Sequence, residues 1–216
     1  MEKQNKNGQV EEKEQAMSQE TDISASEVRS RGKARVGGFG SLRRLCFAAI
    51  LAAMSLVLGK FLQIPHPFQE FIRISFENLP VLLAGVSMGP IVGAFVGAVA
   101  DLLGCVLYGY SINPIVTLGA ASVGLVSGFL ARYVVKKSLL AKVMVSVSLA
   151  HLVGSVLIKS AGLAAWYLAK YEFGYLEFLG WRFLNYIIIG VAECLVLYLL
   201  LRNRAFAKQI KEICKI

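Results

Sequence analysis

Long apolar blocks, separated by short polar turns that contain glycine or proline, fill the chain between residues 42 and 201. An α-helix rises 1.5 Å per residue, so about 20 apolar residues cross the ~30 Å hydrocarbon core of a bilayer. The pattern predicts spans at about 42–62, 74–88, 90–108, 114–135, 140–169 and 183–201. The expected fold class is an all-α membrane protein with six transmembrane helices.

The scarcity of acidic side chains in these blocks supports a location within a membrane. An ionised side chain at the bilayer centre costs roughly 3 kcal/mol or more, so blocks cleared of charge avoid that cost. Only 17% of the chain is charged and 56% is hydrophobic, whereas a soluble domain is about 25% charged. The acids between residues 44 and 201 are Glu70, Glu77, Asp101, Glu172, Glu177 and Glu193.

The two ends of the chain differ from the apolar blocks. Residues 1–40 carry seven acids and seven lysines or arginines, a composition that cannot bury a core and predicts a disordered cytoplasmic tail. Residues 41–204 form the predicted six-helix membrane domain, and residues 205–216 form a short basic cytoplasmic tail.

Positive charge gathers in three flanking segments, before the first span, between the fourth and fifth, and after the sixth. With six spans all three segments lie on one side, which the positive-inside rule makes the cytoplasm, so both termini are predicted to be cytoplasmic. This bias accounts for the net charge of +9, and we predict no nucleic-acid partner. The residues are Arg31, Lys33, Arg35, Arg43, Arg44, Arg132, Lys136, Lys137, Lys142, Arg202, Arg204, Lys208, Lys211 and Lys215.

The chain offers little material for metal, cofactor or nucleotide chemistry. It has two histidines and four cysteines, without a CxxC or HExxH pattern. It also lacks the GxxxxGK[ST] phosphate loop, so no ATPase is expected in the chain itself. We predict no metal and no cofactor.

Small residues recur at helical spacing in two of the predicted spans. Gly89, Gly93 and Gly97 lie four residues apart, and the first span contains the pairs Ala48/Ala52 and Ala49/Ala53. Residues of this size let helices approach closely in lipid. They are either seams within the protein or a docking face for another membrane protein, and the sequence leaves both open.

Several ionisable groups remain inside or beside the apolar blocks. Arg73 and Glu77 are four residues apart, so on a helix they would pair. Asp101 follows the glycine face, either as a hydrogen-bond anchor for a neighbouring helix or as a ligand contact. The segment 61–72 contains Pro65 and Pro67 and forms either a structured cap or an interfacial turn.

A second polar group lies in the last two predicted spans. Lys159 belongs to the fifth span, and Trp181, Arg182 and Asn185 lie at the start of the sixth. Two cations, an indole and an amide converging on one face suit an organic anion that carries a flat ring. Glu193, deep in the sixth span, is either the counter-charge of Lys159 or a helix-packing contact.

The run RISFENLPVLLAGVSMGPIVGAFVGAVADLLGCVLYGYSINP at residues 73–113 resembles the substrate-binding (S) components of energy-coupling-factor (ECF) transporters, and looks most like their folate family. The features that match are Arg73, Phe76, Leu79-Pro80, Gly85, Gly89-Pro90, Gly93, Gly97 and Asp101-Leu102-Leu103-Gly104. The resemblance implies a multi-pass protein of the cell membrane that captures a vitamin from outside. Its implied partners are the lipid bilayer, a transmembrane coupling subunit and two cytoplasmic ATPases, and docking is implied through Ala48, Ala49, Ala52 and Ala53.

The resemblance also implies an outward-facing ligand pocket. Arg73, Lys159 and Arg182 would take the carboxylates of folate, and Asp101 or Asn113 would take its pterin ring. Pantothenate, a smaller anion, would use the same cations, so the vitamin stays open. The other classes considered are a small membrane enzyme, for which the acids are too dispersed, and a non-transport scaffold; we expect no enzyme. The predicted substrate-binding residues are Arg73, Asp101, Asn113, Lys159, Trp181, Arg182 and Asn185.

Overall fold

The computed structural model describes residues 42–62, 64–65, 73–135, 138–164 and 174–214. Within them a bundle of helices is joined by one short hairpin, in which Ile64 pairs with Ile74 and Pro65 with Arg73. The elements are α2 (Leu42–Phe61), β1 (Ile64–Pro65), β2 (Arg73–Ile74), α3 (Asn78–Met88), α4 (Pro90–Tyr108), α5 (Pro114–Phe129), η1 (Leu130–Val134), α6 (Leu139–Ala150), η2 (His151–Ile158), α8 (Tyr175–Arg202) and α9 (Arg204–Cys214). The predicted tail at residues 1–40 lies outside the described residues.

Five helices in the described residues are long and apolar enough to cross a membrane, which makes this a multi-pass membrane protein. They are Leu42–Phe61, Pro90–Tyr108, Pro114–Val134, Leu139–Ala164 and Tyr175–Arg202. The third and fourth predicted spans agree with these bounds because a proline opens each helix at its first position.

Two predicted helix starts are wrong. The helix expected from residue 74 begins at Asn78, because Ile74 belongs to β2. The resulting α3 has 11 residues, about 16 Å of helix against ~30 Å of hydrocarbon. The last long helix begins at Tyr175 rather than at residue 183, since its first two turns carry charged and polar residues that end the apolar block but not the helix.

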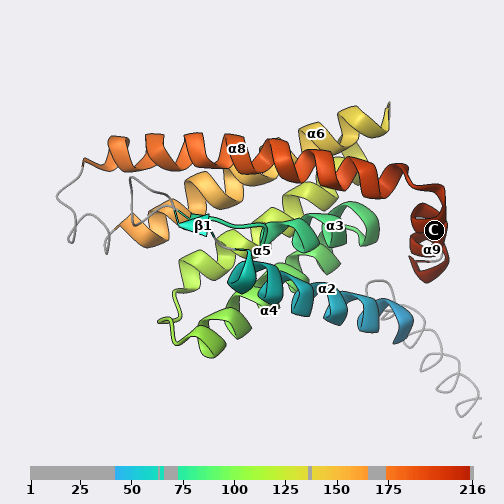
Figure 1. The fold of residues 1–216 in the computed structure, drawn as a ribbon, viewed down its shortest axis with the longest axis horizontal. Coiled ribbons are helices and arrows are strands. Elements are labelled where there is room, and N and C mark those ends of the chain that lie inside the picture. The colour runs from blue at the N-terminus through green and yellow to red at the C-terminus, as the bar shows by residue number, and fades with distance from the viewer. Residues whose placement is uncertain (1–41, 63, 66–72, 136–137, 165–173, 215–216) are drawn as a thin grey trace, which may run out of the picture. The chain divides into compact units, whose positions relative to one another are not determined.

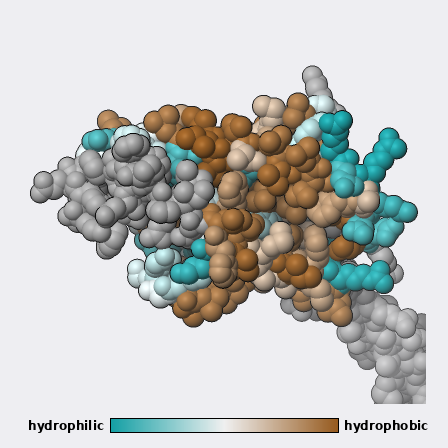
Figure 2. Space-filling model, in the orientation of Figure 1, coloured by the Kyte–Doolittle hydropathy of each residue, from teal (hydrophilic) through white to brown (hydrophobic). Residues whose placement is uncertain are grey.

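The long helices run up and down between two ends of the molecule. Figure 1 shows α9 at one end and β1 near the other, with α8 extending between them. We call these the α9 end and the hairpin end. Apolar surface covers the middle of the molecule, and hydrophilic residues gather at the α9 end (Figure 2). The basic segment after residue 204 is itself a helix, α9, in which Ile210 is buried and Lys208 is exposed.

The centre of the bundle is a glycine-lined contact between α4 and α5. A Cβ added at Gly124 would lie 2.0 Å from the carbonyl oxygen of Gly93, and one at Gly97 would lie 2.3 Å from the carbonyl oxygen of Ala120. Two of the predicted ladder glycines, Gly93 and Gly97, therefore pack helices within the chain. Gly89 has a different role, because its φ of +102° turns the chain between α3 and α4.

This contact predicts that one added methyl group would force α4 and α5 apart. Gly124→Ala should lower the unfolding free energy by about 2 kcal/mol, because a methyl group meets the Gly93 backbone rather than a movable side chain. Thermal unfolding in detergent measures the change. Gly180→Ala is the control, since a Cβ at this position of α8 meets nothing within 4 Å; an equal loss of stability in both variants would contradict the prediction.

Candidate functional site

A polar cavity of about 100 Å³ lies among α2, α3, α4 and α5, where Lys159 also reaches it. It belongs to the hairpin end, because it uses the last turns of α2 and α4 and the first turn of α3. Its lining combines charged, aromatic and small residues: Ser55, Leu56, Gly59, Glu77, Asn78, Val81, Gly97, Ala100, Asp101, Gly104, Cys105, Tyr108, Tyr110, Ala120 and Lys159.

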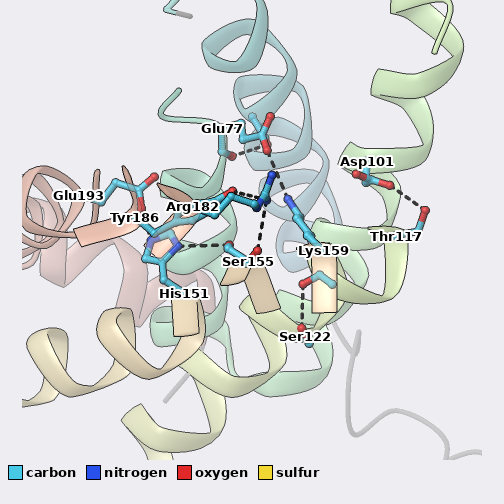
Figure 3. Close-up of polar contacts among 12 residues, drawn as sticks. Glu77, Asp101, Thr117, Ser122, His151, Ser155, Lys159, Arg182, Tyr186 and Glu193 are labelled. Carbon is cyan, nitrogen blue, oxygen red and sulfur yellow. Dashed lines mark hydrogen bonds and ion pairs between the residues drawn. The ribbon is translucent and has the colours of Figure 1, made fainter. Parts of the chain in front are cut away.

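The charged centre of this cavity is an ion pair between Lys159 and Glu77. Lys159 Nζ lies 3.3 Å from Glu77 Oε1, as Figure 3 shows. The side chain of Lys159 is 7% exposed and that of Glu77 is 40% exposed. The predicted pairing of Arg73 with Glu77 on one helix is wrong, because Arg73 belongs to β2. Lys159 also takes its counter-charge from Glu77 rather than from Glu193.

Asp101 faces the same cavity from α4. Its Oδ2 accepts a 2.7 Å hydrogen bond from the hydroxyl of Thr117 on α5, so it links two helices and also lines the cavity. Beside it the hydroxyl of Tyr108 donates to the carbonyl of Leu56. Lys60 lies over the Tyr108 ring, with its ammonium 5.1 Å from the ring centroid. Carboxylate, cation and aromatic ring thus occur together at one end of the bundle.

Asn113 has a structural role at this end. Its side-chain oxygen accepts from the amide of Ile115 and so caps α5, and its amide nitrogen donates to the carbonyl of Gly162 at 2.7 Å. Asn113 therefore ties the start of α5 to the segment that follows η2. It is not among the residues that line the cavity.

The residues predicted on α8, Trp181, Arg182 and Asn185, are not among those that line the cavity. Arg182 and Asn185 are buried and Trp181 is half-buried. Arg182 Nη2 donates to the carbonyl of Ser155 in η2 at 3.3 Å. For Arg73 the structure gives the backbone in β2, and its side chain lies outside the described part of the chain.

A buried contact between two ionisable side chains was missed by the sequence analysis. His151 Nε2, at the start of η2, lies 2.5 Å from Glu193 Oε2 on α8, and both side chains are buried. The two residues are 42 positions apart, so no local motif joins them. The sequence did carry one indication of this contact: Glu193 is an acid deep in an apolar helix, and such a group requires a partner.

The comparisons with known proteins agree with this architecture. The sequence profile described as ECF-type riboflavin transporter, S component, matches residues 40–204. The folate transporter FolT of Clostridium novyi (strain NT) is 33% identical over 64 residues, 30% of this chain and 36% of that protein. The aligned stretch thus spans about a third of this curated relative.

Two solved structures share the fold. The crystal structure of FolT bound with folic acid superposes with a TM-score of 0.58 at 23% identity, covering 74% of this chain and 93% of that one. The structure of the S component of a bacterial ECF transporter gives a TM-score of 0.60 at 26% identity, covering 77% and 97%. The apolar helices and the polar cavity define a small multi-pass membrane protein with a candidate binding site. The chain belongs to the family of ECF-type transporter S components.

The unequal burial of Lys159 and Glu77 predicts an unequal response to removing either charge. Glu77→Gln leaves a buried ammonium without its counter-charge and should lower stability by about 2 kcal/mol. Lys159→Met should lower it less, because water reaches the remaining carboxylate. Thermal unfolding of both variants and of the double variant measures this, and the double variant should recover most of the Glu77→Gln loss. A larger loss for Lys159→Met would contradict the prediction.

Proposed function

We propose that this protein is the folate-binding S component of an ECF transporter. The observation that carries the proposal is the cavity at the hairpin end, where Asp101, Lys159 and Tyr108 stand around one small space. Its ~100 Å³ is below the ~300 Å³ at which whole small-molecule sites begin. The cavity bounded by the described residues therefore suits a ring, with the rest of the vitamin extending past its rim.

Folate divides into chemical parts that this end of the bundle can recognise. The pterin ring presents N–H donors along one edge, and a carboxylate such as that of Asp101 accepts them as charge-assisted hydrogen bonds. The tyrosines at the cavity offer aromatic contact to a flat ring. The glutamate part of folate carries carboxylates, which suit the exposed ammonium of Lys60 beside Tyr108. Lys159 lines the cavity itself and so faces the part of the vitamin that enters it.

Riboflavin is the second candidate, because the family profile carries its name. Its isoalloxazine ring is also flat and has an N–H donor, but it carries no carboxylate. The exposed ammonium of Lys60 over the Tyr108 ring is therefore the feature that favours folate over riboflavin. Pantothenate has a carboxylate and no ring, so it would use the cations without the tyrosines.

We further propose that the chain crosses the cell membrane six times with both termini in the cytoplasm. Arg44 lies in the first turn of α2, Arg132 in η1 after α5, and Arg202 is the last residue of α8. Figure 1 shows the start of α2 and the end of α8 toward the α9 end. The positive-inside rule assigns that end to the cytoplasm, and the cavity then opens toward the outside. In this arrangement α3 and the adjoining hairpin together form the second crossing.

Energy for import would come from a separate coupling subunit and two ATPases, as in other ECF transporters. The two alanine pairs of α2 differ in their availability for docking. Ala48 and Ala52 are buried within the chain, whereas Ala49 and Ala53 are exposed. We therefore assign the docking face to Ala49 and Ala53, and we assign Ala48 and Ala52 to the contact of α2 with α3 and α4.

The proposed substrate predicts saturable binding of folate to the purified chain. Quenching of tryptophan fluorescence on titration with folate, riboflavin and pantothenate measures it. Asp101→Asn should weaken folate binding about tenfold, because it removes a charged acceptor from the ring site. Glu177→Gln is the control, since this exposed acid lies in the first turn of α8 outside the cavity lining.

The same titration separates the alternatives. Saturation by riboflavin alone would make this a riboflavin-binding S component and overturn the assignment of folate. Saturation by pantothenate alone would do the same in favour of a smaller anion. Protein that is folded but binds none of the three would refute the vitamin-binding role.

The docking assignment predicts that added bulk on α2 blocks the coupling subunit but not the vitamin. Ala49→Leu should weaken co-purification with the coupling subunit about tenfold, because a larger side chain prevents close helix approach. Folate affinity should stay unchanged. Ile50→Leu is the control, since it lies on the same helix, is 59% exposed and conserves volume. Equal loss of both activities in Ala49→Leu would indicate misfolding and remove the assignment.

A further inference from the structure

A chain of buried polar contacts joins η2 to α8 behind the cavity. Glu193 Oε2 lies 2.5 Å from His151 Nε2, and His151 Nδ1 lies 3.3 Å from the hydroxyl of Ser155. The carbonyl of the same Ser155 accepts from Arg182 Nη2 at 3.3 Å. Figure 3 shows these side chains converging from the two helices. We call the four residues Glu193, His151, Ser155 and Arg182 the α8 clamp.

Aromatic rings of α8 contact two ionisable members of the α8 clamp, His151 and Arg182. The His151 ring stacks on Tyr186, with centroids 5.3 Å apart and planes 27° apart. The Arg182 guanidinium lies 5.5 Å from the Tyr186 centroid and 5.6 Å from that of Phe178. Guanidinium groups held between rings in a dry site keep one orientation. The α8 clamp therefore packs η2 against α8 through polar and aromatic contacts together.

The backbone hydrogen bonds of η2 bear on the contact between Arg182 and the carbonyl of Ser155. In this π-helical segment the amide of Lys159 donates to the carbonyl of Gly154, five residues back. In an α-helix it would donate to the carbonyl of Ser155. The Ser155 carbonyl therefore does not receive the Lys159 amide, and it accepts from Arg182 Nη2. Removal of Arg182 would leave a buried carbonyl without its side-chain donor and favour a different register at the end of η2.

Lys159 directly follows Ile158, the last residue of η2. On the side facing α5, a Cβ added at Gly119 would lie 2.5 Å from Lys159 Cγ and 2.9 Å from the carbonyl oxygen of Gly154. The stem of Lys159 is therefore held against α5 on one side, while Arg182 fixes the preceding turn on the other. From this position its ammonium reaches Glu77 in the cavity.

We propose that Arg182 is a positioning residue, which acts through Ser155 and η2 to set where the Lys159 ammonium stands in the cavity. His151 and Glu193 support it by anchoring the start of η2 to α8. Arg182 then controls vitamin affinity without touching the vitamin. The inference rests on the proposed function for the identity of the ligand, but not for the packing of η2.

A double-mutant cycle tests this route of action. Folate affinity is measured by isothermal titration calorimetry for the wild type, Arg182→Gln, Lys159→Met and the double variant. Each single substitution should weaken binding about tenfold. The double variant should bind no more weakly than Lys159→Met alone, because Arg182 acts only through Lys159. Additive losses would mean that Arg182 contacts the ligand directly, and an unchanged affinity in Arg182→Gln would remove its role; both overturn the proposal.

Amide hydrogen exchange provides a measurement that needs no ligand. Arg182→Gln should speed exchange at the end of η2 and in the turn after it, residues 156–162, while exchange in α4 and α5 stays as in the wild type. Unchanged exchange at 156–162, or a uniform increase throughout the protein, would overturn the proposal. If the wild type fails to bind folate, the substrate assignment fails, and this measurement still decides the role of Arg182.

Arg202→Gln is the matched control for both measurements. Arg202 is also an arginine of α8 placed over a tyrosine ring, 5.9 Å from the Tyr198 centroid. It is exposed and lies at the α9 end, far along the helix from η2. Its removal should leave folate affinity and the exchange of residues 156–162 at wild-type values. A matching effect in Arg202→Gln would show that loss of any α8 arginine suffices, which contradicts the positioning role.

Discussion

The absence of hydrogen-bond partners in hydrocarbon is the constraint on which this structure depends. A charged or polar group within the bilayer must find its partner in the protein itself. In the described residues Lys159 pairs with Glu77, His151 with Glu193, and Asp101 with Thr117. Each of these contacts joins two different elements, so satisfying the charges also fixes how the helices lie against one another.

Close helix approach is the second requirement, and it places the polar groups where they can meet. Lipid provides no hydrophobic force between helices, so association relies on close packing and interhelical hydrogen bonds. The contact of Gly93 with Gly124 brings the backbones of α4 and α5 together. That approach allows Thr117 on α5 to reach Asp101 on α4, and it closes one wall of the cavity. The same residues therefore serve packing and recognition.

The sequence predicted most of the helices but few of their contacts. Gly89-Pro90 and Asn113-Pro114 punctuate the chain clearly, so the starts of α4 and α5 agree with the structure. The early start of α8 was missed because Glu177 and Arg182 interrupt the apolar sequence of its first turns, and hydropathy detects apolar blocks rather than helices. The partners of Lys159 and Glu193 were missed because they lie 82 and 42 residues away. Single-sequence spacing carries information about neighbours within a turn or two, and these pairs are tertiary.

The predicted site residues show the same limit, because sequence spacing does not reveal tertiary contacts. Residue type singled out Asp101 and Lys159, and both line one cavity, because few ionisable groups remain in the apolar blocks and they tend to gather; their role in binding stays a prediction. It did not distinguish a group that faces the cavity from one that stands behind it. Arg182 has the charge and the neighbouring indole expected of a ligand contact, yet its hydrogen bond goes to the backbone carbonyl of Ser155, which the π-helical turn leaves without the Lys159 amide. That distinction depends on helix register, a property of the backbone that side-chain patterns do not record.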